Sequence, residues 1–475
     1  MTSVSQAAGR ERAGPAVLVA VLVFLAVQST AVGSLGTPLL TTVQRAYHVS
    51  LAASQWALTI TLLAGAVATP VMGRLGDGRL RRQATLGGVA FMLAGCVLSA
   101  LPIGFAAFLA GRGLQGAGLG LIPLATAVAR DDLPAGRSRP TIALIGITTA
   151  AGIGIGYPLV GLLAEYLGLG APFWFVAALS ALALAAAAAV LPPSPSRPAR
   201  LDVTGALTLG LGITGLLLVL AEGPVWGWAS PASLGCAVAS VALLAGWVAA
   251  ELRARRPLID LRLLRHRSVL AANVTAFLVA VGFYPLASLV VRYVQTPPGA
   301  GYGFGASVVL AGLMLTPFSL ASFAASRVAG PLARRTSAEL VVAASCVLLI
   351  ASMLVFLLAR GAYWQLVVAM AVDGFGVGCV YAVNPLQITG GVPAAETGSA
   401  ISFYQLVRTV AYSLGSTLSA TVLVLYLPRG RVLPAAAGYS AAAVVCLAVL
   451  VAALAASSLF ALAAGLGAEN TEATA

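Results

Sequence analysis

The chain has 475 residues, of which 60% are hydrophobic and only 9% are charged, and its mean hydropathy is +0.99. Soluble globular domains carry about 25% charged residues, so this composition excludes an ordinary water-soluble protein. The apolar residues gather in runs of about twenty, which is the length that a helix needs to cross a bilayer. The sequence therefore predicts an all-α integral membrane protein embedded in the lipid bilayer.

The formal net charge of +13 comes from 27 basic residues, all of them arginine, against 14 acidic residues. In a soluble protein this excess would suggest nucleic acid, but in a membrane protein it is typical of cytoplasmic loops. We therefore expect no nucleic-acid partner. The five cysteines all lie inside apolar runs without paired spacing, which favours small buried side chains over a disulfide framework or a zinc site.

Fourteen apolar runs follow one another along the chain and predict fourteen membrane spans. Two arginines precede the first run, as in a signal peptide, but this run is longer than the usual apolar core of one. The runs cover residues 15–36, 53–73, 84–102, 105–127, 141–163, 172–192, 204–222, 232–250, 269–291, 304–325, 339–359, 363–386, 399–426 and 437–463.

The distribution of arginine tests this topology. With the N-terminus in the cytoplasm, twenty arginines fall in inner segments, five fall in outer segments and two lie within spans. Because basic residues concentrate in cytoplasmic loops, this asymmetry predicts a multi-pass protein of the cell membrane with both termini in the cytoplasm. The outer arginines are Arg45, Arg292, Arg360, Arg429 and Arg431, and those within spans are Arg112 and Arg408.

Two cytoplasmic segments divide the chain. The Pro-rich stretch PPSPSRPAR (192–200) cannot continue a helix, and ELRARRPLIDLRLLRHR (251–267) suits an amphipathic helix along the inner leaflet. We expect a six-span half at 1–192, a linker with two central spans at 193–268, and a second six-span half at 269–475. A weak repeat agrees, because GRLGDGRLRR and GPLARR each follow the second span of a half. Repeated six-helix halves are the plan of a large class of secondary transporters.

A specific loop motif follows the second span, at the end of SQWALTITLLAGAVATPVMGRLGDGRLRR (54–82). On this motif and the span count, the chain resembles the major facilitator superfamily, and within it the fourteen-span drug:proton antiporters. Gly73, Asp77, Arg81 and Arg82 match the family's loop signature, whereas Leu80 replaces its second Gly. The resemblance implies that these residues latch the cytoplasmic side, with Asp77 accepting hydrogen bonds from a helix N-terminus or pairing with Arg.

The fourth span carries LAGRGLQGAG (109–118), which is similar to the family's Arg-x-x-Gln-Gly element. The resemblance implies that Arg112 and Gln115 line a substrate cavity. The alternative is a structural clamp on neighbouring carbonyls. In either role the Arg112 side chain faces away from lipid, because placing an arginine at the centre of a membrane helix raises the free energy of insertion by about 2.5–3.5 kcal/mol.

The fifth span contains GIGIGYPLVG (152–161), which resembles the Gly-rich antiporter signature with its central Pro. Gly152, Pro158 and Gly161 would then bend this helix and allow close packing. Tyr157 stands where that signature has Gly before Pro, and this departure weakens the inference of proton exchange more than that of the fold.

The first span departs from the family in a second way. Fourteen-span relatives commonly carry an Asp-x-Thr pattern there, and this chain has Gln28 in place of the Asp and retains Thr30. Glutamine can hydrogen-bond a substrate, but it cannot carry a proton.

Asp373 is the one acidic residue near the middle of a predicted span, about ten residues from the span's outer boundary. At 1.5 Å per residue this position is about mid-bilayer, and Arg408 of the next span lies at the same expected depth. Arg408 also matches an arginine that family members tend to carry. We expect the two to form a pair whose breaking couples to protonation, the alternative being a permanent structural ion pair.

The remaining polar residues within spans supply orienting groups for an otherwise apolar cavity. Each of them individually is more often a helix–helix contact than a ligand contact. Both histidines are isolated, so we expect no metal site, and no motif indicates a cofactor. The cavity candidates are Gln28, Arg112, Gln115, Tyr157, Tyr404 and Gln405.

These features predict a monomeric secondary transporter rather than an enzyme. We expect it to export small amphipathic organic compounds, such as drugs or antibiotics, in exchange for protons, with two six-span halves rocking around a central cavity. The alternatives are a proton-coupled importer of a nutrient and a membrane-embedded lipid-modifying enzyme. An enzyme would need clustered acids, histidines or metal ligands at a membrane face, which the sequence lacks.

Overall fold

The computed structural model describes residues 14–76, 78–194, 202–254, 261–392, 397–428 and 433–472. Its regular elements within these ranges are all helical, as the apolar runs predict. The longer helices are α1 (Pro15–Ser34), α2 (Leu40–Ala46), α3 (Leu51–Gly76), α4 (Arg81–Ala100), α5 (Phe105–Ala117), α6 (Leu121–Asp132), α7 (Ala135–Leu167), α8 (Gly170–Val190), α9 (Val203–Trp226), α10 (Pro231–Arg253), α11 (Arg267–Gln295), α12 (Val308–Leu313), α13 (Thr316–Arg335), α14 (Ala338–Leu358), α15 (Tyr363–Gly391), α16 (Thr397–Leu425) and α17 (Ala436–Glu472).

Twelve helical segments of the described chain are long and apolar enough to cross a membrane. They include α1 with α2, α5 with α6, and α12 with α13, each pair following one continuous path. The prediction of an all-α, multi-pass membrane protein is confirmed. The remaining two predicted spans overlap α7 and α16, which are 33 and 29 residues long but are not among the twelve, and the count of fourteen spans stays a prediction.

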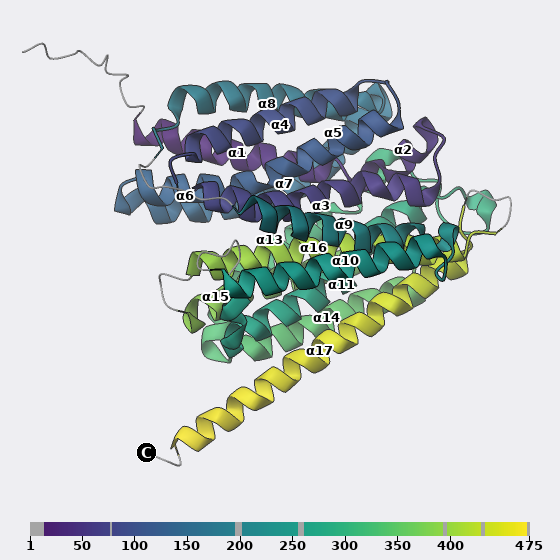
Figure 1. Cartoon of the computed structure of the whole chain (residues 1–475). Coiled ribbons are helices and arrows are strands. Elements are labelled where there is room, and N and C mark those ends of the chain that lie inside the picture. Colours follow the sequence, from purple (N-terminus) through teal and green to yellow (C-terminus); the bar gives the residue numbers. More distant parts are fainter. Residues whose placement is uncertain are drawn as a thin grey trace, which may run out of the picture.

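The helices gather into two bundles with separate cores (Figure 1). The first bundle comprises α1 and α3 to α8, whose inward faces meet around Leu22, Met92 and Phe173. The second comprises α11 and α13 to α17, which meet around Leu286, Leu349 and Phe356. Burial of such side chains is worth about 1.5–3 kcal/mol each in water, but in lipid it is close packing that holds a bundle together.

Helices α9 and α10 pack on each other at the seam between the two bundles. The side of α9 that carries Leu209 and Ile213 packs with Leu63 of α3 and with Phe403 and Leu406 of α16. A single added helix pair therefore contacts both bundles at once, and α10 is left largely on the outside, with only four of its residues buried.

The two ends of the molecule differ in character. One end, here called the basic end, carries the turn between α3 and α4, the C-terminal ends of α6 and α8, and the Arg-rich segment after α10. Helix α1 begins and α17 ends there (Figure 1). The opposite end, here called the α2 end, carries α2, the start of α3 and the end of α11.

Helix α7 of the first bundle crosses α12, which leads into α13 of the second bundle. A Cβ added to Gly161 of α7 would lie 2.7 Å from the carbonyl oxygen of Val308, and one added to Gly312 of α12 would lie 2.6 Å from that of Tyr157. Two glycines therefore face each other's backbone across the seam. This arrangement is the close helix packing that small residues allow.

Candidate functional site

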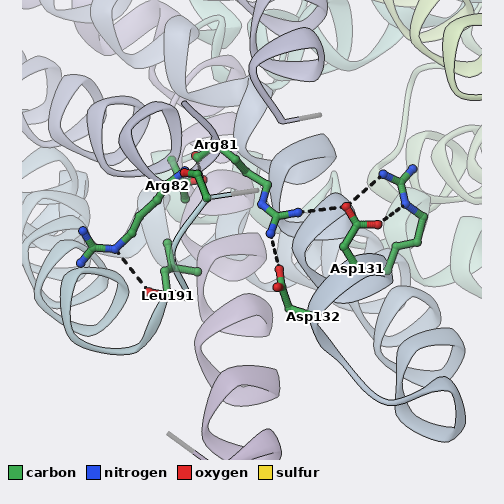
Figure 2. A network of polar contacts seen from close by, with 8 residues as sticks. Arg81, Arg82, Asp131, Asp132 and Leu191 are labelled. Atoms are coloured by element: carbon green, nitrogen blue, oxygen red, sulfur yellow. Dashed lines mark hydrogen bonds and ion pairs between the residues drawn. The ribbon is translucent and has the colours of Figure 1, made fainter. Parts of the chain in front are cut away.

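Arg81, the first residue of α4, ties that helix to the end of α6 (Figure 2). Its side chain is almost fully buried, and its guanidinium donates to Asp131 Oδ2 at 3.0 Å and to the carboxylate of Asp132. Buried arginine–carboxylate pairs of this kind fix geometry because the guanidinium presents a rigid fork of donors. Neither aspartate was among the predicted site residues. Two adjacent acidic residues at the end of the fourth span, on the same side of the membrane as the basic pair of the motif, would have indicated them.

Arg82 makes a second connection, from α4 to the end of α8 (Figure 2). Its guanidinium donates to the carbonyl oxygens of Ala188 at 2.6 Å and Leu191 at 3.3 Å, so it caps the negative end of the α8 dipole. Gly73 lies within α3, and Asp77 lies outside the described residues. Two of the predicted latch residues thus hold three helices of the first bundle together at the basic end.

Arg112 and Gln115 of α5 form a buried clamp inside the first bundle. Arg112 is 1% exposed; its Nε donates to the carbonyl of Ala57 on α3, and its Nη1 donates to Gln115 Oε1. Gln115 in turn donates to the carbonyl of Gly95 and to Ser99 Oγ, both on α4. Of the two roles weighed for this pair, the contacts favour the structural clamp.

Gln28 is also committed to packing within the first bundle. It is fully buried on α1, and its Nε2 donates to Ser180 Oγ of α8 at 2.8 Å and contacts Met92 Sδ of α4 at 3.0 Å. Its Oε1 has no hydrogen-bond partner among the described residues. The structure therefore places this side chain between three helices of one bundle and away from the seam.

The second bundle carries a cluster of four tyrosines and one arginine, here called the tyrosine–arginine cluster: Tyr284, Tyr381, Tyr404, Arg408 and Tyr412. The guanidinium carbon of Arg408 lies 3.5 Å from the ring centroid of Tyr381, and its Nη2 donates to the Tyr412 hydroxyl at 2.8 Å. The Tyr412 ring stacks on that of Tyr284, with centroids 4.6 Å apart. Cation–π and stacking contacts hold one cation against aromatic faces of α11, α15 and α16.

Two of the predicted cavity residues join this cluster, and a third faces it from the other bundle. Tyr404 lies 5.3 Å from the Arg408 guanidinium, and Gln405 Oε1 accepts a hydrogen bond from Arg408 Nη1 at 2.8 Å. Tyr157 of α7 lies close enough to Tyr284 and Tyr412 to interact with them electrostatically. Arg112 of α5 also interacts electrostatically with Tyr284, so the structure brings four of the six predicted cavity residues to this cluster.

Asp373 of α15 is buried, with 1% exposure, and its Oδ1 has no hydrogen-bond partner among the described residues. Cys446 of α17 is a titratable neighbour that interacts with it electrostatically. Asn384, three turns further along α15, donates to the carbonyl of Ala272 on α11. Asp373 therefore lies inside the second bundle and does not face the seam.

The structure does not bring Asp373 and Arg408 together as the predicted ion pair. Among the described residues, the ion pairs that are resolved involve Arg81 and Arg130, and the guanidinium of Arg408 contacts hydroxyls, an amide and aromatic rings instead. The depth of the two residues was inferred along each helix. Rotation about the helix axis, which decides what a side chain faces, is not set by depth.

At the α2 end, Arg292 links the two bundles. The sequence analysis assigned it to an outer segment, but α11 continues to Gln295 and the side chain is 3% exposed. Its Nη2 donates to Ser54 Oγ and to Gln55 Oε1, each at 3.1 Å, on the first turns of α3. The predicted run ended at residue 291, and the apolar pattern alone does not show that the helix continues past it.

Further polar contacts beside Arg292 join the same two bundles. Gln55 Nε2 donates to Ser416 Oγ of α16 at 2.5 Å, and the hydroxyls of Thr59 and Thr417 lie 3.3 Å apart. Thr41 of α2 hydrogen-bonds Gln295. These contacts, with Arg292, are here called the α2-end contact, and they close the seam at that end.

The fifth-span signature also lies at this seam. Pro158 lies inside α7, and Gly161 makes the close approach to α12 described above. The surroundings of Gly152 are outside the described residues. Glu165, one turn further on, accepts a hydrogen bond from the backbone N–H of Val309 at 2.9 Å and so caps α12 from the other bundle.

A pocket of about 610 Å³ opens beside the α2-end contact. Its polar lining comes from both bundles and includes Arg45, His48, Arg292, Gln44 and Gln295. Across the described residues, no group of three or more His, Cys, Asp or Glu gathers as metal ligands would.

Comparisons with known proteins agree with this arrangement. Residues 19–416 match the sequence profile of the Major Facilitator Superfamily. The chain is 32% identical over 298 residues to the tetracenomycin C resistance and export protein of Streptomyces glaucescens, a match covering 61% of this chain and 54% of that protein. It is 27% identical over 399 residues to the multidrug resistance protein Stp of Mycobacterium tuberculosis (81% and 71% covered). It is 29% identical over 392 residues to a probable actinorhodin transporter of Streptomyces coelicolor (78% and 66%).

Solved structures share the fold at low sequence identity. A peptide transporter, POT, in complex with sulfate superposes with a TM-score of 0.65 at 16% identity, covering 93% of this chain and 94% of that one. The human organic anion transporter MFSD10 gives a TM-score of 0.61 at 18% identity, covering 94% and 100%. With the profile match over most of its length, the chain belongs to the Major Facilitator Superfamily of membrane transporters, as its motifs predict, and is a transporter rather than an enzyme.

Proposed function

We propose that this protein is a proton-coupled exporter of small amphipathic organic compounds, of the drug- and antibiotic-efflux type. Its relatives are named for antibiotic export and multidrug resistance. The chain spans only about half, 54%, of the length of the tetracenomycin C relative, so function is carried over as a proposal. The observation that carries it is the tyrosine–arginine cluster at the seam, a small set of polar groups on an aromatic wall, which is typical of amphipathic ligand sites.

In this proposal the basic end faces the cytoplasm, where basic loops belong, and both termini lie on that side of the cell membrane. The α2-end contact then closes the outer face, so the structure is an inward-facing state. The two bundles, with boundaries near residues 192 and 269, rock about the seam to open the outer face in turn. The protein acts as a monomer, since each bundle already finds its partner within the chain.

Asp373 is the proposed proton carrier. An ionised carboxylate without a partner is costly in an apolar interior, so this group suits a site that holds a proton in one state of the cycle. It shares α15 with Tyr381, which contacts Arg408, and their separation of eight positions along the helix spans about 12 Å. In this proposal, protonation of Asp373 is coupled to the tyrosine–arginine cluster along α15, in place of the direct ion pair between Asp373 and Arg408 that the sequence suggested.

The test is transport by the purified protein in liposomes, with tetracenomycin C as the first compound because a relative is named for its export. We expect accumulation inside vesicles whose interior is acidic, and loss of that accumulation when an ionophore collapses the pH gradient. Accumulation that persists after the collapse would contradict proton coupling. Absence of transport for this compound and for a panel of amphipathic antibiotics would contradict the efflux function.

A further inference from the structure

Two buried arginines, Arg112 and Arg292, and the partly buried Arg408 have neutral oxygens as hydrogen-bond acceptors. Arg112 donates to a backbone carbonyl and an amide, Arg292 to a hydroxyl and amides, and Arg408 to a hydroxyl and an amide. Each retains a full positive charge because guanidinium does not lose its proton in proteins. Arg81, by contrast, is compensated by two aspartates. The interior near the seam therefore carries positive charge that no contacting carboxylate cancels.

Arg408 also has hydrogen-bonding capacity to spare. A guanidinium has five N–H donors, and the three bonds to Tyr412 and Gln405 engage three of them. The side chain is only partly buried, as are those of Tyr284, Tyr381 and Tyr412. The cluster thus presents a cation with free donors beside stacked aromatic faces that the protein covers only in part.

The pocket at the α2 end has the same electrostatic character. Arg45 and Arg292 contribute to its lining, and none of its lining residues is an aspartate or glutamate. In the inward-facing state it lies beyond the closed contact, on the side where an exported compound leaves. Cationic groups therefore mark the middle of the proposed route and its exit.

Three carboxylates within the membrane-spanning part do not contact the cluster. Glu165 caps the N-terminus of α12, and Glu222 accepts a hydrogen bond from the Trp56 indole at 3.4 Å. Asp373 is buried within the second bundle. None of the three contacts Arg408, and no described carboxylate forms an ion pair with the cluster.

We propose that the preferred substrates are planar aromatic compounds carrying an acidic group, with the anion bound by Arg408 and the ring stacked on the tyrosines of the cluster. This inference rests on the proposed export function and adds the charge of the substrate. Arginine binds carboxylates through paired hydrogen bonds, and away from bulk water the attraction is little screened by salt. Offset stacking on tyrosine rewards flat ring systems over flexible chains. A cationic compound of the same shape would meet repulsion at the cluster and again at the pocket.

Three probes that share one ring system separate charge from shape: anthracene carboxylate, anthracene carboxamide and aminomethyl-anthracene. Binding to the purified full-length protein is followed by their fluorescence at neutral pH. We expect the carboxylate to bind at least tenfold more tightly than the amine, with the neutral amide between them. Equal or tighter binding of the amine would overturn the proposal, and so would the absence of binding by all three probes.

Arg408→Gln is the matched variant, because it keeps a polar side chain and removes the charge. We expect carboxylate binding to fall at least tenfold while amide binding changes by less than threefold. Arg265→Gln, at an exposed arginine of the basic end, is the control and is expected to leave all three affinities unchanged. An undiminished preference for the carboxylate in Arg408→Gln would overturn the assignment to this residue. Should this variant not fold, the comparison of the three probes on the unaltered protein still decides the charge preference.

The outcome is independent of the transport assay above. Preference for the amine together with accumulation driven by a pH gradient would refute the anionic substrate and leave the export function standing. Preference for the carboxylate without any accumulation would support the anionic substrate and contradict the export function.

Discussion

At the scale of single residues, the hydrogen-bond acceptors that stabilise the charge of Arg112 are neutral groups. A carbonyl of α3 and the amide oxygen of Gln115 accept its hydrogen bonds, and the Gln115 amide nitrogen in turn donates a hydrogen bond to α4. A buried charge depends on every acceptor that it has, since hydrogen bonds to charged groups are worth about 1.5–3 kcal/mol each. Gln115 is therefore as important to the clamp as the arginine itself.

We expect Gln115→Leu to lower the free energy of unfolding by about 1.5–3 kcal/mol, because Arg112 loses an acceptor that no water replaces. The measurement is thermal unfolding of the purified protein in detergent. Gln83→Leu, at an exposed position of α4, is the control and should unfold as the parent does. Equal stability of the two variants would show that Gln115 is dispensable to the clamp.

Residue identities at the motif were predictable, whereas their partners were not. Arg81 and Arg82 stand in a spacing that marks the loop after a second span, so their place at a helix start could be inferred from sequence. Asp131 and Asp132 lie fifty residues away and meet Arg81 only through the packing of α4 against α6. For the same reason, the common depth of Asp373 and Arg408 could be estimated, but not which way each one faces.

At the scale of elements, the crossing of α7 and α12 depends on two glycines. At each glycine, a backbone carbonyl of the other helix lies where a side chain would otherwise be. Because the neighbouring atoms belong to the backbone, a larger residue cannot be accommodated by a change of rotamer. The helices themselves must separate, and the seam between the bundles must open at this point.

Gly161→Leu should therefore reduce transport at least tenfold while the protein still inserts into the membrane. The added Cβ would lie 2.7 Å from the Val308 carbonyl oxygen and 3.0 Å from the Val309 Cα. Transport into liposomes, normalised to the amount of protein incorporated, is the measurement. Gly235→Leu on α10 is the control, since a Cβ there meets nothing within 4 Å. If the Gly161 variant transports as well as the parent, then transport does not require α7 and α12 to pack closely.

Helix type and position were the most predictable features of the elements, because runs of about twenty apolar residues leave few alternatives. Helix ends were less so. The apolar run that stops near 291 continues as helix to Gln295, which places Arg292 inside the protein instead of in a loop. Hydropathy does not detect this, because a buried arginine with neutral acceptors reads in sequence like the first residue of a loop.

At the scale of the whole molecule, the inter-bundle hydrogen bonds found among the described residues gather at the α2 end. If the bundles rock, these contacts must break in each cycle. Each is worth about 0.5–1.5 kcal/mol, with those of Arg292 stronger, so the set is stable enough to hold one state and weak enough to release it.

Joining Thr59 and Thr417 covalently should arrest that motion. Their hydroxyls lie 3.3 Å apart, so cysteines at both positions are close enough to form a disulfide on oxidation. We expect the oxidised double variant to lose transport and a reductant to restore it, with the two single cysteine variants unaffected by either treatment. Transport at the parental rate by a fully cross-linked protein would contradict alternating access at this seam.

The account as a whole depends most on Asp373, the proposed proton carrier. The decisive measurement compares Asp373→Asn with the parent in liposomes, scoring both accumulation driven by a pH gradient and exchange of labelled for unlabelled compound without a gradient. We expect the variant to lose gradient-driven accumulation and keep exchange, because asparagine preserves the packing but cannot release a proton. Glu165→Gln is the matched control and should retain gradient-driven accumulation. Undiminished gradient-driven accumulation by Asp373→Asn would contradict the account.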